Sequence, residues 1–129
     1  MRLAFAAAAL LLCAATPALA TGGFECRPMS GAGPALIVGI GHGLSLRPFT
    51  VWIRDGKSLL AAQGGGGGQL ELGQTWIDSQ YLWVDLLDSR RERFEAKLRA
   101  TFQPKLKDRP AIGTLAWRGR TYRVRCIEA

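Results

Sequence analysis

Apolar and polar residues alternate along much of the chain, most clearly near its C-terminal end. There Tyr122, Val124 and Cys126 alternate with Arg123 and Arg125. Because successive side chains of a strand point to opposite faces of a sheet, this pattern predicts a half-buried strand. Its cysteine points inward, and its two arginines face solvent.

Residues 93–102 alternate in the same way and are predicted to form another strand. A helix is the alternative, because the segment holds good helix formers and three of its apolar residues have helical spacing, namely Phe94, Leu98 and Phe102. The strand is favoured because Ala96 and Ala100 also follow the period of two. It places three basic side chains in solvent, those of Arg93, Lys97 and Arg99.

Short apolar or alternating segments elsewhere complete the pattern. Further strands are predicted at 35–40, 49–55, 58–63, 69–78, 81–88 and 112–118. Gly73 is a candidate β-bulge, and the five glycines of Gly64–Gly68 are typical of a loop tip. Hairpin turns are predicted at Asp55-Gly56, Asp88–Arg91 and Arg118-Gly119.

Strands of this spacing, joined by short turns, define the expected fold class. We predict an all-β fold, a small antiparallel meander barrel or a sandwich of about eight strands. The first and last strands carry Cys26 and Cys126. In a meander that closes on itself these two strands are neighbours, so one disulfide is expected to close the barrel.

The N-terminal segment has the layout of a secretory signal peptide. Arg2 precedes an apolar run that ends in Ala18-Leu19-Ala20, a small-residue cleavage site. We therefore expect a cleaved signal peptide over 1–20 and a single β-domain over 21–129, exported to the periplasm or the extracellular space. After cleavage no transmembrane segment is expected.

Two other interpretations of this segment are an uncleaved anchor and a lipidated cysteine. The apolar run is shorter than the ~20 residues that span a bilayer. Cys13 follows Leu12, where a lipidation site has a small residue. Cleavage also removes Cys13 and leaves only Cys26 and Cys126, which are expected to pair in an oxidising compartment.

The chain is strongly basic. It holds 17 Lys and Arg against 10 Asp and Glu, and loss of Arg2 with the signal peptide leaves 16 − 10, a net charge of +6. A basic surface attracts anionic partners, here an envelope component or an acidic protein. A merely solvated surface is the alternative. Nucleic acid is not expected for an exported protein without a recognised nucleic-acid-binding motif.

No residue pattern indicates catalysis or a cofactor. His42 is the single histidine, with no metal ligands at suitable spacing around it. The stretch 39–44 has Leu44 where a dinucleotide fingerprint has its third glycine. Arginine usage well above lysine usage, with abundant alanine and glycine, is typical of a high-GC bacterium. We expect a protein that is not an enzyme and that holds neither a cofactor nor a metal.

Aromatic residues give a second candidate binding feature. Trp52 and Arg54 share the polar face of one predicted strand, and Tyr81 and Trp83 share that of another. If the two strands were neighbours, these side chains would form an aromatic and cationic platform. The alternative is that a loop or strand covers this face.

The sequence therefore predicts an exported, non-catalytic β-domain that binds an envelope component or a protein partner. The candidate binding residues are Trp52, Arg54, Tyr81, Trp83, Arg99, Arg123 and Arg125. A carrier that holds a small ligand inside the barrel is one alternative, and an enzyme with an unrecognised site is another. The layout resembles small disulfide-closed β-barrels of bacterial envelopes, including lysozyme inhibitors, with no shared motif.

Overall fold

The computed structural model describes residues 22–40, 48–63 and 69–128. The predicted signal peptide, His42 and the run of five glycines lie outside these ranges. The described residues form strands and no helix. The strands are β1 (Gly23–Pro28), β2 (Ala35–Ile40), β3 (Pro48–Asp55), β4 (Ser58–Gln63), β5 (Leu70–Ile77), β6 (Tyr81–Leu87), β7 (Phe94–Phe102), β8 (Ala111–Trp117) and β9 (Arg120–Glu128).

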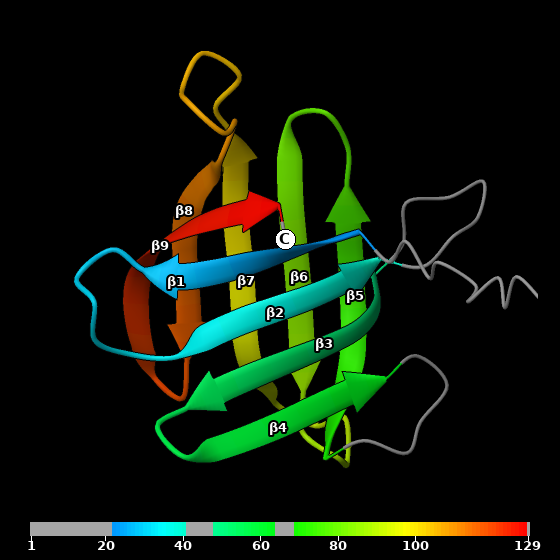
Figure 1. The fold of residues 1–129 in the computed structure, drawn as a ribbon. Helices are drawn as coiled ribbons and strands as arrows, with labels where there is room; N and C mark the ends of the chain where they lie inside the picture. Colours follow the sequence, from blue (N-terminus) through cyan, green and yellow to red (C-terminus); the bar gives the residue numbers. More distant parts are fainter. Residues whose placement is uncertain (1–21, 41–47, 64–68, 129) are drawn as a thin grey trace, which may run out of the picture.

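The nine strands follow one another in chain order and close into a barrel, because β9 pairs with β1 (Figure 1). The predicted meander barrel is confirmed, and its nine strands are close to the expected eight. One pairing differs from the all-antiparallel expectation, since β4 and β5 are parallel. Their contact spans only two residue pairs, at the point where β4 ends and β5 begins.

The period of two sets which side chains fill the barrel, and β7 is a strand rather than a helix. Ala96, Leu98 and Ala100 point inward and are buried. Phe94 breaks the expected pattern, because the pairing of β6 with β7 shifts register beside it and turns its side chain out to solvent. The outward ring is then covered on one side by the ammonium group of Lys97, 4.0 Å from the ring centre.

Every strand contributes to one hydrophobic core. Most of these side chains have no surface that a water molecule can touch, so they fill the interior between the described strands. The buried hydrophobic residues are Cys26, Leu36, Val38, Val51, Ile53, Ala62, Leu70, Leu82, Val84, Leu86, Ala96, Leu98, Ala100, Ala111, Leu115, Trp117, Val124 and Cys126.

The predicted hairpin turns form where the sequence places them. At Arg118-Gly119 both residues have positive φ, 47° and 81°, the backbone twist that suits a two-residue hairpin. Before β7, the Asp88 carboxylate accepts hydrogen bonds from the backbone amides of Glu92 (2.8 Å) and Arg93 (3.4 Å). The bond from the Glu92 amide is the main cause that lowers the pKa of Asp88.

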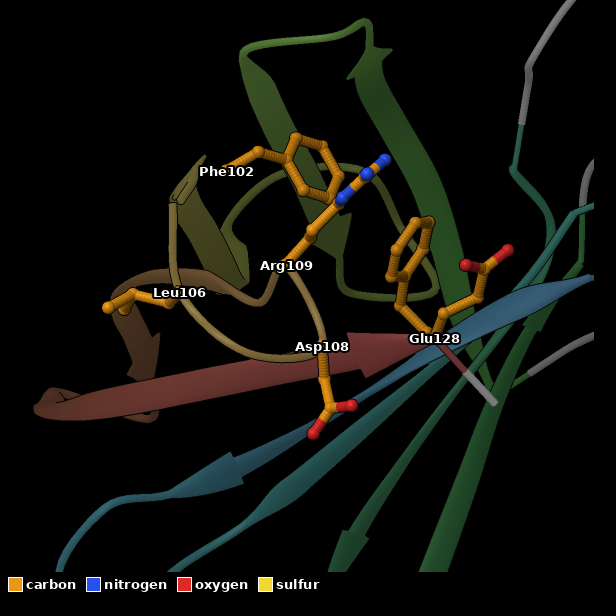
Figure 2. A pocket seen from close by; sticks show the side chains of 6 residues that line it. Phe102, Leu106, Asp108, Arg109 and Glu128 are labelled. Carbon is orange, nitrogen blue, oxygen red and sulfur yellow. The ribbon is translucent and has the colours of Figure 1, made fainter. Parts of the chain in front are cut away.

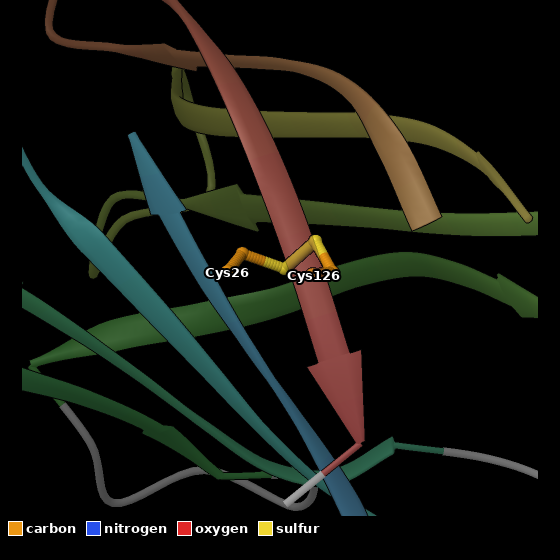
Figure 3. The surroundings of a disulfide bond; sticks show 2 residues. All are labelled: Cys26 and Cys126. Carbon is orange, nitrogen blue, oxygen red and sulfur yellow. A yellow bond between two sulfur atoms is a disulfide. The ribbon is translucent and has the colours of Figure 1, made fainter. Parts of the chain in front are cut away.

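The disulfide joins the two ends of the barrel sequence. Cys26 on β1 and Cys126 on β9 are direct strand partners, with Cα atoms 3.8 Å apart, and their sulfurs are bonded (Figure 3). Both residues are fully buried. The bond spans 100 residues of sequence, so in the chain-entropy model it stabilises the fold by about 4.7 kcal/mol.

Candidate functional site: the outer face of β5 to β9

Two tryptophans lie opposite each other on the outside of the barrel. Trp76 on β5 is the strand partner of Trp83 on β6, and their exposed fractions are 57% and 41%. Trp83 is among the binding residues predicted from the sequence, and Trp76 is not. The sequence does carry a signal for Trp76, because the predicted strands 69–78 and 81–88 are joined by a short connection. In a tight hairpin, residues at equal distances from the turn lie opposite each other.

Asp78 holds this hairpin and one of its indoles in place. Its carboxylate accepts hydrogen bonds from Trp76 Nε1 (2.8 Å) and from the backbone amides of Gln80 and Tyr81 (2.7 Å each). The bond from the Trp76 indole is the largest cause that lowers the pKa of Asp78, followed by the two backbone bonds. With its N–H group engaged, Trp76 presents mainly its ring to solvent.

Tyr81 completes what we call the aromatic cluster, Trp76, Tyr81 and Trp83. The rings of Tyr81 and Trp83 lie 5.3 Å apart at a tilt of 46°. The guanidinium group of Arg99 on β7 lies 5.3 Å from the centre of the Trp83 ring, within cation–π range. The cluster is thus an exposed, largely apolar surface whose two tryptophans are positioned by the Asp78 carboxylate and the Arg99 guanidinium group.

Arg99 differs from the solvent-facing arginine that the alternation predicts. Its Nη2 lies 2.8 Å from Oδ1 of Asp85, a residue only 5% exposed, and its Nη1 donates to the Leu98 carbonyl at 2.8 Å. The ion pair does not have hydrogen-bond geometry, and Oδ1 has no other partner in the described part of the chain. Arg99 therefore serves mainly to neutralise a buried charge, and its side chain is 39% exposed.

Asp85 is buried on the outer face because the neighbouring strand bulges over it. The pairing of β5 with β6 shifts register between Leu72 and Thr75, which confirms Gly73 as the predicted bulge. A Cβ atom at Gly73 would lie 3.1 Å from the Cβ and carbonyl oxygen of Asp85. The glycine thus allows the backbone to cover the carboxylate.

The outer face continues into exposed arginines. In register, Trp83 neighbours Arg99, which neighbours Thr114, which neighbours Arg123 on β9. Arg125 is the strand partner of Arg27 on β1. We call Arg27, Arg123 and Arg125 the basic strip; all three are exposed. At roughly 4.8 Å per strand, β9 lies about 15 Å around the barrel from Trp83.

The members of the basic strip differ in how their charge is balanced. Arg27 forms an ion pair with Glu25 at 2.8 Å. Within the described ranges, Arg123 and Arg125 have no carboxylate at ion-pair distance, and Arg125 makes only a long hydrogen bond of 3.5 Å to the Lys107 carbonyl. Their two charges are therefore open to a binding partner.

The other two predicted binding residues lie elsewhere on the barrel. Trp52 and Arg54 are on β3, which β4 and β5 separate from β6. The structure therefore does not bring them together with Tyr81 and Trp83. Trp52 is half-buried between its strand partners Ile37 and Ala61, and Arg54 is exposed.

A pocket of about 430 Å³ opens at one end of the barrel (Figure 2). Its wall includes the rings of Phe24 and Phe102, 5.5 Å apart, and charged side chains at its rim. The connection between β7 and β8 forms the other side, where Asp108 and Arg109 both have positive φ. The lining residues are Phe24, Phe102, Leu106, Asp108, Arg109 and Glu128.

The described residues contain no group of three or more His, Cys, Asp or Glu side chains placed to hold a metal ion. Nor do they contain a helix that is long and apolar enough to cross a membrane. No protein-family model matches the chain, and neither a curated protein nor a solved structure matches it significantly.

Proposed function

We propose that this protein is an exported, non-catalytic β-domain that binds an anionic component of the cell envelope on the outer face of β5 to β9. The observation that carries the proposal is the combination of an exposed aromatic cluster with Arg123 and Arg125 on the same wall of the barrel. The ligand groups that fit are phosphates or carboxylates on a scaffold that also has apolar surface.

The physical support comes from charge and from rigidity. The basic side chains attract anions over a Debye length of ~8–10 Å, and an arginine fork matches phosphate and carboxylate geometry. The aromatic cluster adds contact area at low entropic cost, because each ring has few rotatable bonds and is held by neighbours. The filled interior favours binding on this outer wall over carriage of a ligand inside the barrel.

The test uses two probes of the same chemistry from different sources, vesicles that contain an anionic phospholipid and a soluble polyuronate. We expect the protein to bind at least one of them, with affinity that falls steeply as salt rises. The Arg123→Gln/Arg125→Gln variant should lose most of that affinity. A matched control, Arg54→Gln/Lys57→Gln, removes the same charge from the exposed β3–β4 hairpin and should retain it.

The variants also separate specific from general attraction. If both double variants lose affinity equally, net charge alone is responsible and the proposed face is wrong. The Trp83→Ala variant should also weaken binding, but its affinity should depend on salt as that of the unmodified protein does. Binding to neither probe, with retention of an acidic protein instead, would replace the envelope component with a protein partner.

A further inference from the structure

The pocket at the end of the barrel is lined by four segments of the chain. Phe24 on β1 and Glu128 on β9 are strand partners, and Phe102 is the last residue of β7. The connection between β7 and β8 supplies the other three lining residues, Leu106, Asp108 and Arg109. All six lie within the described ranges. The volume of about 430 Å³ falls in the range of small-molecule sites, roughly 300–1,000 Å³.

The wall of this pocket offers apolar and aromatic contact. The rings of Phe24 and Phe102 are inclined to each other by 56°, and both side chains are partly buried against the core. Leu106 adds an apolar side chain that is 50% exposed. A phenyl or branched alkyl group of a ligand would therefore lose contact with water on binding here.

Backbone hydrogen bonds fix the connection that carries Leu106 and Arg109. The Gln103 amide donates to the Pro110 carbonyl at 2.8 Å, and the Arg109 amide donates to the Leu106 carbonyl at 3.1 Å. Arg109 has a φ of 44°, a conformation that is costly for a residue other than glycine and that persists where the surroundings hold it. This side of the pocket is thus formed before a ligand arrives, which lowers the entropic cost of binding.

The charged side chains of the pocket are not paired with one another. Among the described residues, Asp108, Arg109 and Glu128 form no ion pair and no side-chain hydrogen bond. In Figure 2 the side chains of Arg109 and Glu128 point to the same side, whereas that of Asp108 points the other way. A cation and an anion that share a pocket without meeting can each bind one end of a ligand that carries both charges.

We propose that this pocket binds a free amino acid with an apolar side chain. The ligand carboxylate pairs with the Arg109 guanidinium group, whose fork matches carboxylate geometry. The ligand ammonium group pairs with the Glu128 carboxylate, and the apolar side chain packs against Phe24 and Phe102. The site uses different residues from the outer face of β5 to β9, so the two proposals stand or fall separately.

The probes are phenylalanine, tested as each enantiomer, and two derivatives that each lack one charge. N-acetylphenylalanine has no ammonium group, and phenylalanine amide has no carboxylate. Amide chemical shifts of Leu106, Asp108 and Arg109 should change saturably during titration with phenylalanine. One enantiomer should bind at least about tenfold more tightly than its two derivatives, because each derivative loses one charge-assisted contact.

Two variants assign the charges to their partners. Arg109→Gln should abolish the preference for phenylalanine over its amide, and Glu128→Gln should abolish the preference over the N-acetyl derivative. The controls Arg120→Gln and Glu92→Gln remove the same charges at exposed positions, one at the start of β9 and one just before β7. Both controls should keep both preferences, and the amide spectrum of each variant verifies that the barrel is intact.

Three outcomes would contradict this proposal. One is equal affinity of the unmodified protein for phenylalanine and for either derivative, which would mean that the pocket recognises a single charge. Another is the absence of saturable shifts in the pocket at the solubility limit of phenylalanine. The third is saturable binding that shifts Trp83 and Arg123 instead, which would place the amino acid on the outer face.

Discussion

The barrel is closed firmly between β1 and β9 and loosely between β4 and β5. The first contact joins the two ends of the chain, yet it has five residue pairs and a disulfide. The second joins strands that are neighbours in sequence and has two pairs. Proximity in sequence therefore does not determine strength of pairing here. Bringing β1 and β9 together costs more conformational entropy, because a longer loop of chain must be closed. The disulfide offsets this cost at the contact where it is largest.

The largest expected effect comes from breaking the firm closure. Replacing Cys26 and Cys126 together with alanine should lower the free energy of unfolding by about 4–5 kcal/mol, since the loop between them is freed in the unfolded chain. Urea unfolding of the exported protein measures this. In the unmodified protein neither thiol should react with an alkylating agent before reduction, and a reaction without reductant would contradict the bond.

The loose closure should be sensitive at one buried side chain. Leu70 is 4% exposed and pairs with Ala62 at the β4–β5 contact. Leu70→Ala should cost about 2–4 kcal/mol by leaving a cavity. Leu59→Ala, at an exposed leucine of β4, should change the free energy of unfolding by no more than about 0.5 kcal/mol. Equal losses in the two variants would mean that Leu59 contributes as much to stability as the buried Leu70.

On the fully paired wall the two kinds of arginine should respond differently. Arg99→Gln leaves the buried Asp85 carboxylate without its cation and should cost about 2–3 kcal/mol, somewhat less than a fully buried pair because Arg99 is partly exposed. Arg123→Gln should be nearly neutral. Adding Asp85→Asn to Arg99→Gln should restore much of the loss, and failure to do so would remove the ion pair as the cause.

The smallest expected effect concerns acid and the β5–β6 hairpin. The pKa of Asp78 is lowered in the folded protein, first by the indole bond of Trp76. Its stabilising contribution is therefore complete above the unfolded pKa of about 3.9 and is lost as pH falls through the lower folded value. Compared with Asp78→Asn, the unmodified protein should have the higher Tm at pH 7 and should lose that advantage progressively as the pH falls below the unfolded pKa. A constant difference across this range would contradict the role of the charge.

The sequence by itself determined the features that depend on local periodicity. Alternation predicted the C-terminal strand and favoured a strand over a helix for 93–102, because a strand with one buried face must alternate. Turn residues such as Arg118-Gly119 fixed where hairpins form, since their backbone preferences are local. Two remaining cysteines on the first and last strands were enough to predict the disulfide and a closed barrel.

Only the tertiary structure decided which outward side chains meet. Trp76 faces Trp83 because a hairpin register places them opposite, while Trp52 on β3 is separated from β6 by two intervening strands. The sequence marks Arg99 and Arg123 as equivalent polar positions, yet a bulge on β5 buries Asp85 beneath one of them. Strand order, register and the parallel β4–β5 contact arise from pairing between distant backbones, and a periodic pattern carries no information about which backbones those are.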